Sequence, residues 1–220
     1  MKKILLSITV ILVSIITTGI SGVVLAKDVI PITPSPNTQT IGMYQVGDDI
    51  TIYKEPDENS QILYRVRWNK NNEFFPEEIG FEKFFTVFLE KKALALVEVT
   101  DYTDNWVQIV YNNNTGATGW IKKDDPYKFM TWINFYNTYG KKYGLTLLHG
   151  APESCKNIKS ETSDKGQNIS TMNYPQKINL NVIRGNWALV SVMDLDRTPK
   201  TGYIRWRSDD GIKYFFPDIK

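Results

Sequence analysis

Residues 97–110 read VEVTDYTDNWVQIV, and residues 180–190 read LNVIRGNWALV. Each stretch is followed by a polar segment and then by a similar motif, TGWIK at residues 118–122 and TGYIR at residues 201–205. In both places, residues that favour strands flank a short turn that ends in Asn-Trp. The sequence therefore predicts an internal repeat in which strand, turn, strand, polar loop and strand occur twice.

The repeated motif carries residues that suit turns and close packing. Asp104-Asn105 is expected to form a tight turn, because both side chains tolerate positive φ. Gly119 is expected to permit a bend or a close backbone approach where the next strand begins. We expect structural roles for Asn105, Trp106, Gly119, Asn186, Trp187 and Gly202.

Upstream segments complete each copy. Residues 50–53 and 61–68 alternate in the manner of strands and flank a turn that contains proline. In the second copy, we expect residues 145–148 to take the place of the first of these strands, and 151–153 the place of its turn. Residues 156–158 correspond loosely to the start of the second strand. The expected domains are residues 41–125 and 141–220.

A phenylalanine-rich insert at residues 73–92 distinguishes the first copy. Four of its rings are spaced as on one face of a helix, although Phe84 to Leu89 also suits a strand. Both conformations stay open at this point. The rings are expected either to pack on their own domain or to form an exposed patch for a protein partner.

Residues 126–140 are expected to form a connector helix between the two copies. Asp124-Asp125-Pro126 suits its beginning, and Gly140 suits its end. The aromatic residues of this segment recur at helical spacing, which predicts that they pack between the copies. A cofactor or lipid site on that aromatic face is the alternative.

The first 26 residues have the pattern of a secretory signal peptide. Lys2 and Lys3 precede an apolar run, and Val24-Leu25-Ala26 suits a cleavage site. The alternative is an uncleaved membrane anchor, which would be the only membrane contact of the chain. Residues 27–40 are rich in proline and polar residues and are expected to form an extended linker. We therefore predict a protein of the bacterial cell envelope, periplasmic or extracellular.

The charge of the chain makes nucleic acid an improbable partner. Lys2 and Lys3 are the only charged residues among the first 26, so removal of that segment lowers the 26 basic residues to 24. The chain has 24 acidic residues, which gives a formal net charge of zero. A nucleic-acid-binding protein normally carries a basic excess or a basic stripe, and neither is present here.

The order of these features resembles the bacterial SH3-like domain. Asn105-Trp106 with residues 118–121 matches the Gly/Asn-Trp and Thr-Gly-Trp-[Ile/Val] pattern of that family. Asn186-Trp187 with residues 201–204 matches it with Tyr in place of Trp. The Asn-Val-Arg segment that precedes the proline turn in that family is absent from both copies. The resemblance implies a mainly β fold of two small SH3-like β-barrels in tandem, joined by the aromatic helix.

The resemblance also implies a binding function rather than catalysis. Members of this family often accompany cell-wall hydrolases, and several bind peptidoglycan peptides. The residues agree with this expectation, because the chain has a single histidine, His149, and a single cysteine, Cys155. Both fall in one turn region without the setting of a nucleophile and its base, and no spacing suits a metal site. A lone cysteine forms no internal disulfide, and we expect no cofactor.

Exposed aromatic residues near loop ends are the candidate ligand contacts, because small β domains bind ligands between their loops. The candidates are Tyr53, Trp68, Tyr102, Trp120, Tyr203 and Trp206. A purely structural role in the core is the competing interpretation of each. The expected function is therefore an exported, non-catalytic module that binds peptidoglycan or its peptides. The alternative is a protein–protein interaction scaffold.

Overall fold

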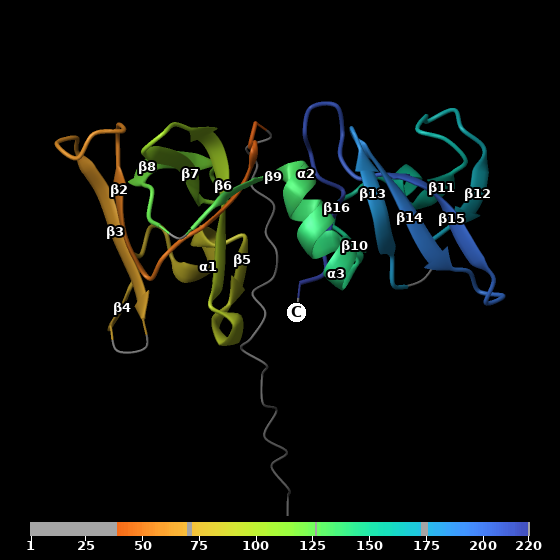
Figure 1. The fold of residues 1–220 in the computed structure, drawn as a ribbon, viewed down its shortest axis with the longest axis horizontal. Helices are drawn as coiled ribbons and strands as arrows, with labels where there is room; N and C mark the ends of the chain where they lie inside the picture. The colour runs from red at the N-terminus through yellow and green to blue at the C-terminus, as the bar shows by residue number, and fades with distance from the viewer. Residues whose placement is uncertain (1–38, 70–71, 126, 173–175, 220) are drawn as a thin grey trace, which may run out of the picture.

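The structure is a computed structural model that describes residues 39–69, 72–125, 127–172 and 176–219. It is mainly β, with antiparallel sheets and few helices, as the sequence predicted (Figure 1). The expected signal segment 1–26 and nearly all of the linker 27–40 lie outside the described residues. Within the described ranges, no helix is long and apolar enough to cross a membrane.

The first half of the molecule, residues 39–131, contains one nine-stranded sheet. Its strands are β1 (Gly42–Gln45), β2 (Asp49–Tyr53), β3 (Ile62–Asn69), β4 (Asn72–Phe74), β5 (Val87–Leu89), β6 (Leu94–Tyr102), β7 (Trp106–Asn112), β8 (Ala117–Lys122) and β9 (Phe129–Thr131). They pair in the order β4-β3-β2-β8-β7-β6-β1-β9, and β5 adds to β6.

The second half, residues 145–219, has a five-stranded sheet of order β12-β11-β15-β14-β13 and a two-stranded sheet, β10-β16. Its strands are β10 (Leu145–Leu147), β11 (Asn157–Lys159), β12 (Asn168–Thr171), β13 (Asn179–Arg184), β14 (Trp187–Met193), β15 (Pro199–Arg205) and β16 (Phe215–Pro217). A bridge between Leu145 and Ile178 places β10 beside the start of β13.

The strand order of the second half repeats that of the first. The path β3-β2-β8-β7-β6-β1-β9 corresponds strand by strand to β12-β11-β15-β14-β13-β10-β16. The irregularities correspond as well. A register shift between Val99 and Asp101 of β6 recurs between Leu180 and Val182 of β13. The internal repeat is therefore present in the fold and extends beyond the quoted motif to seven strands.

The structure corrects the expected alignment of the second copy. Strand β11, not residues 145–148, takes the place of β2, since both pair with the last strand of the central meander. The register shift between Ile52 and Tyr53 recurs between Ile158 and Lys159. Residues 145–147 form β10, which occupies the place of β1. Alternation alone identified a strand there but gave no information about its neighbours.

The expected closed barrels are not observed. The sheet of the first half ends at β4 on one side and β9 on the other, and the path of the second half ends at β12 and β16. The first half is therefore one open antiparallel sheet, and the second half consists of two antiparallel sheets linked by the bridge between Leu145 and Ile178. The bulges shared by both halves bend the strands without joining the two ends of each path.

The phenylalanine-rich insert combines the two conformations that the sequence left open. It forms a short helix α1 (Phe81–Phe84), then β5, then a 3-10 turn η1 (Glu90–Lys92). Phe84 and Phe85 are completely buried and join the core of the first half with Val97 and Ile109. The buried rings of the insert thus pack on their own half, which was one of the two arrangements expected from the sequence.

The connector helix begins and ends later than the sequence predicted. It comprises α2 (Trp132–Phe135), η2 (Tyr136–Gly140, with π-helical bonding) and α3 (Lys141–Tyr143). Its cap is the Thr131 hydroxyl, which accepts from the Asn134 N–H at 3.3 Å, and it ends at Gly144, with φ of 87°. The expected start at 126 is wrong because residues 129–131 pair with β1 as strand β9.

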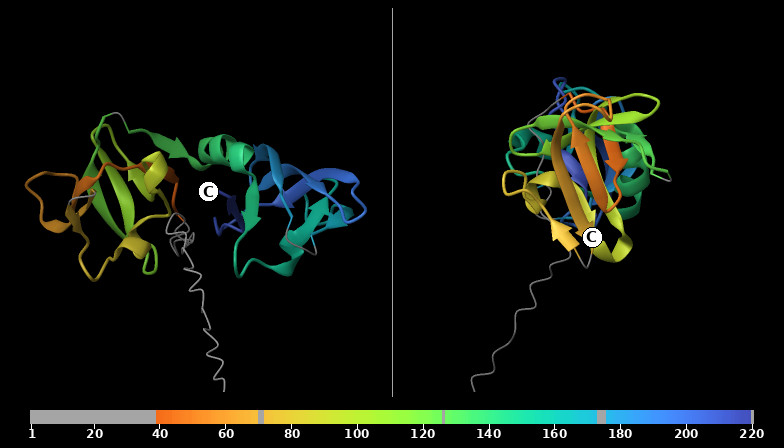
Figure 2. Two further views of the ribbon diagram at one scale, coloured as in Figure 1. Left: turned by 90° about the horizontal axis from the view of Figure 1, so that it is seen from below. Right: turned by 90° about the vertical axis from the view of Figure 1, so that its left-hand side faces the viewer.

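This helix lies between the two halves, which are arranged side by side along the long axis (Figures 1 and 2). Its Phe135 belongs to one apolar cluster with Met43 and Leu96 of the first half and Phe216 of the second. The prediction of aromatic packing between the copies is confirmed. Figure 2 shows the helix joining the halves after β9.

A buried ion pair joins the halves at the same seam. The Lys213 ammonium lies 3.1 Å from a carboxylate oxygen of Glu98, and their side chains are 4% and 0% exposed. Lys213 also donates to the Thr40 hydroxyl at 3.2 Å and lies 4.2 Å from the ring centroid of Trp132. The other Glu98 oxygen, Oε1, has no hydrogen-bond partner. A charge buried in this way depends on its partner for stability.

Candidate functional site

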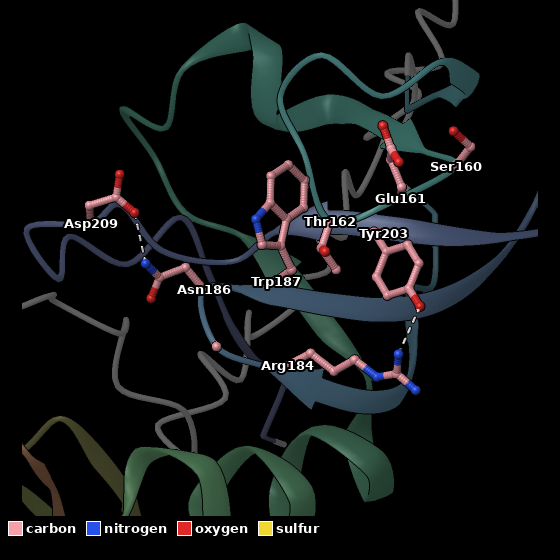
Figure 3. A pocket seen from close by; sticks show the side chains of 9 residues that line it. Ser160, Glu161, Thr162, Arg184, Asn186, Trp187, Tyr203 and Asp209 are labelled. Carbon is pink, nitrogen blue, oxygen red and sulfur yellow. Dashed lines mark hydrogen bonds between the residues drawn. The ribbon is translucent and has the colours of Figure 1, made fainter.

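The largest hollow that we describe surrounds the second Asn-Trp turn, and we call it the Trp187 hollow (Figure 3). Its volume is about 430 Å³. Its lining comprises Ser160, Glu161, Thr162, Arg184, Gly185, Asn186, Trp187, Tyr203 and Asp209. These residues come from the loop after β11, the β13–β14 turn, β15 and the segment after β15.

The turn that forms one wall of this hollow follows from Gly185. Its φ of 57° is the conformation that glycine adopts without strain, and the two-residue turn Gly185-Asn186 aligns Arg184 with Trp187 across the hairpin. Trp187 is half-buried at the start of β14. It therefore presents part of its ring to the hollow while the remainder packs on the sheet.

Charged groups of both signs line the Trp187 hollow. Glu161 and Arg184 are exposed, and the Arg184 guanidinium lies 3.4 Å from the Tyr203 hydroxyl. The Asp209 carboxylate accepts from Arg205 at 2.7 Å and from Asn186 Nδ2 at 2.8 Å. The hydrogen bond from Arg205, followed by that from Asn186, holds the pKa of Asp209 below its ordinary value. Asp209 is therefore an anion at neutral pH.

Trp187 also lines a second hollow, the Arg205 hollow, of about 260 Å³. Its lining comprises Pro152, Ser154, Cys155, Asn157, Lys159, Asp164, Trp187, Arg205 and Tyr214. The Arg205 guanidinium lies 5.9 Å from the ring centroid of Trp187 and pairs with Asp164 as well as Asp209. Trp187 thus lines two hollows that both contain charged side chains.

Cys155 and His149 differ in their surroundings. Cys155 is 4% exposed, and burial raises the pKa of its thiol, which keeps it protonated at neutral pH. His149 is exposed and lines none of the hollows described here. Among the described residues, no group of three or more His, Cys, Asp or Glu side chains is placed to hold a metal ion.

The first half has a hollow of about 300 Å³, which we call the Lys122 hollow. Its lining comprises Tyr44, Val46, Gly47, Asp49, Ile50, Thr51, Tyr53, Ile121, Lys122, Lys123 and Asp124. The Tyr53 ring lies edge-on to Trp106, with centroids 5.5 Å apart. The first Asn-Trp ring is therefore packed against a side chain of its own half.

The structure brings two of the six predicted ligand residues into these hollows. Tyr203 lines the Trp187 hollow, and Tyr53 lines the Lys122 hollow. Tyr102 is 42% exposed but lies outside all three hollows, with its ring beneath Lys123 and beside Phe129.

The remaining three predicted ligand residues pack in or against the core. Trp120 and Trp206 are 8% and 0% exposed, so their side chains are core residues rather than ligand contacts in this structure. The indole N–H of Trp206 donates to the Gly185 carbonyl, which supports the second turn. Trp68 is half-buried among Phe75, Phe84 and Phe85. The position of these aromatic residues in the sequence did not determine whether their side chains face the core or a hollow.

The predicted structural residues occupy corresponding places in the two halves. Gly119 and Gly202 lie opposite Ile109 and Val190 on the neighbouring strands. A Cβ on Gly119 would meet Ile52 at 2.5 Å, and one on Gly202 would meet Ile169 at 2.4 Å, so both glycines permit close approach as expected.

The two Asn-Trp turns differ in conformation. Among the described residues, only Ala93 and Arg197 are non-glycine residues with positive φ, so the tight turn expected at Asp104-Asn105 forms without the positive φ that both side chains tolerate. The Thr103 hydroxyl instead accepts from the Trp106 N–H at 3.2 Å and closes the first turn. In the second half, Gly185 provides the positive φ and leaves Asn186 free to bond Asp209 and Arg207.

The charged residues around Trp187 were missed by the sequence analysis. Glu161, Asp164, Arg184 and Asp209 belong to loops and strand ends that the repeat does not specify. Arg205 alone had a usable signal, as the last residue of TGYIR, where the first copy has Lys122. Comparison of this chain with protein-family models, curated proteins and solved structures found no match.

Proposed function

We propose that this chain is an exported, non-catalytic binding module for peptidoglycan or its peptides. The observation that carries the proposal is that Trp187 lines two hollows that contain carboxylates and guanidinium groups. A half-buried indole with charged groups of both signs suits a ligand that has an apolar face and both amino and carboxylate groups. Amino sugars linked to short peptides have this composition.

The distribution of charge supports a zwitterionic ligand over a simple anion or cation. The carboxylates of Glu161 and Asp209 both line the Trp187 hollow and can accept from an amino group. Arg184 and Arg205 can donate to a carboxylate, and guanidinium groups bind carboxylates with two parallel hydrogen bonds. A ligand lying across the indole would contact both kinds of group.

The cell-envelope assignment rests on sequence. Residues 1–26 have the signal-peptide pattern, and the Asn-Trp and Thr-Gly motifs resemble bacterial SH3-like domains, of which we propose this chain has two divergent copies. The alternative scaffold function drew on an exposed aromatic insert. Phe84 and Phe85 are completely buried, and Phe74 is the one ring of the insert that is largely exposed, at 56%, so the insert presents no exposed cluster of rings for a partner.

The test is co-sedimentation of the full-length chain with purified peptidoglycan sacculi. We expect the protein to pellet, and Trp187→Ala to weaken binding about tenfold, the size of effect that follows truncation of a buried aromatic anchor. Tyr102→Ala is the matched control, because it removes an exposed ring outside the hollows and should bind like the wild type. Absence of pelleting at tens of micromolar protein would refute the proposal.

A further inference from the structure

The strand register identifies Lys122 and Arg205 as the same position in the two halves. Lys122 lies directly opposite Trp106 across β7 and β8, and Arg205 lies directly opposite Trp187 across β14 and β15. A basic side chain thus lies beside each Asn-Trp turn. In both halves it is the last residue of the strand that contains the Thr-Gly pair.

Each of these cations is paired with an acid from the corresponding loop. Glu58, between β2 and β3, bonds Lys122, and Asp164, between β11 and β12, bonds Arg205. The two acids are 59% and 67% exposed, so each reaches its partner from a solvent-facing loop. Since β2–β3 corresponds to β11–β12, the ion pair itself is duplicated.

The hollows next to the cations are also duplicated. Thr51 and Tyr53 of β2 line the Lys122 hollow, and Asn157 and Lys159 of β11 line the Arg205 hollow. The register makes these residues equivalent, because Tyr53 pairs with Trp120 as Lys159 pairs with Tyr203. Two hollows with different side chains therefore occupy one place in the repeated fold.

We propose that the Lys122 and Arg205 hollows are two copies of one site for the carboxylate of a peptide. In the free protein, Glu58 and Asp164 occupy the cations, and a ligand carboxylate replaces them. The inference deepens the proposed function, on which it rests for the peptide nature of the ligand, and it gives the chain two ligand sites, one in each half.

Replacement of a loop carboxylate by a ligand carboxylate costs little free energy. An exposed ion pair contributes little to stability, so one carboxylate can replace another without a large loss. The Arg205 side chain is only 22% exposed, and its other terminal nitrogen remains bonded to Asp209 when Asp164 leaves. The Lys122 ammonium is 60% exposed and has a single acid partner among the bonds described here. The Arg205 site should therefore bind more tightly than the Lys122 site.

The test is an NMR titration of the isotope-labelled full-length chain with N-acetyl-D-alanyl-D-alanine in the millimolar range. The indole N–H signals of Trp106 and Trp187 report on the two halves, and the carboxyl carbons of Glu58 and Asp164 report on the exchange. We expect all four to shift with saturation, and the C-terminal amide of the same peptide to shift none. Saturation at Trp187 alone, or an equal response to the amide, would overturn the proposal.

Variants of the loop acids provide the second arm without removal of either cation. Asp164→Asn should tighten binding, measured at Trp187, by up to about fivefold. The variant removes the carboxylate that competes with the ligand for Arg205, and the free energy of an exposed ion pair corresponds to a change of that size. Glu58→Gln should do the same at Trp106 only. Weaker binding in either variant would show that the acid positions the site, which contradicts the proposed exchange. Pelleting with sacculi in the absence of any carboxylate response would leave the proposed function standing and defeat this inference alone.

Discussion

The two halves of this chain share their backbone design but differ in what surrounds the Asn-Trp ring. Both keep the same order of seven strands, two matching register shifts, a glycine in the strand with the Thr-Gly motif and a cation paired with a loop acid. In the first half, Tyr53 packs against Trp106, whereas Trp187 in the second half lines two hollows. Backbone constraints have thus been retained in both copies, while the side chains at the surface have diverged.

The halves also bury their sheets differently. The first fills its core with Phe84 and Phe85 from the insert, which the second half lacks. The second packs Tyr136 of the connector helix against Trp206, with ring centroids 4.4 Å apart. The apolar face of the repeated sheet is therefore buried by the insert in the first half and by the connector helix in the second.

The largest expected effect tests whether the halves are stable independently. Lys213→Met leaves the Glu98 carboxylate buried without its cation, and we expect the free energy of unfolding to fall by about 3–5 kcal/mol. Arg67→Met is the control, since its pair with Asp49 is exposed and should contribute less than about 1 kcal/mol. Urea denaturation followed by tryptophan fluorescence measures both. Equal effects of the two variants would show that the seam does not couple the halves.

The second prediction compares the two equivalent glycines. A Cβ on Gly202 would meet the Lys159 carbonyl oxygen at 2.6 Å, whereas the nearest backbone atom to one on Gly119 is the Tyr53 oxygen at 3.2 Å. Backbone yields less readily than a side chain, so Gly202→Ala should cost about 1–3 kcal/mol and Gly119→Ala less. Thermal and urea unfolding of the two variants give the order. The reverse order would mean that β8 packs more tightly at Gly119 than β15 packs at Gly202.

The third prediction concerns the two turns. Gly185→Ala forces an alanine into positive φ and should cost about 1–2 kcal/mol. Asp104→Ala changes a turn residue with no such requirement and should remain within about 0.5 kcal/mol of the wild type. Equilibrium unfolding measures both differences. A large loss in Asp104→Ala would indicate that its side chain stabilises the first turn.

The smallest expected effect is the pH dependence that Asp209 gives to the stability of the second half. The pKa of Asp209 is lowered in the folded state, so its bonds to Arg205 and Asn186 stabilise the protein above the ordinary pKa of 3.8. That contribution is lost as pH falls through the lower folded value. A carbon-detected NMR titration should give a midpoint below 3.8 for Asp209, and Asn186→Ala should raise it. A midpoint at or above 3.8 in the wild type would contradict the ion pair with Arg205.

The sequence predicted the features that depend on local pattern and missed those that depend on pairing. Alternation and residue type at fixed spacing predict the repeat, the mainly β fold and the close approach of strands at Gly119 and Gly202. The place of β11 does not, because this strand has three residues and only Ile158 among them is buried. Likewise, Trp206 and Tyr203 are both aromatic residues of one segment, yet the first is in the core and the second lines a hollow. Which face a short strand buries is decided by its neighbours.

The pair between Glu98 and Lys213 has a consequence for how the chain is made and destroyed. Glu98 is synthesised well before Lys213, so the first half folds with an uncompensated acid until nearly the whole described chain is present. A molecule that is truncated or cleaved ahead of Lys213 keeps that acid without its partner. Loss of Lys213 thereby affects the sheet of the first half, which we expect to open more readily and to become more susceptible to proteolysis.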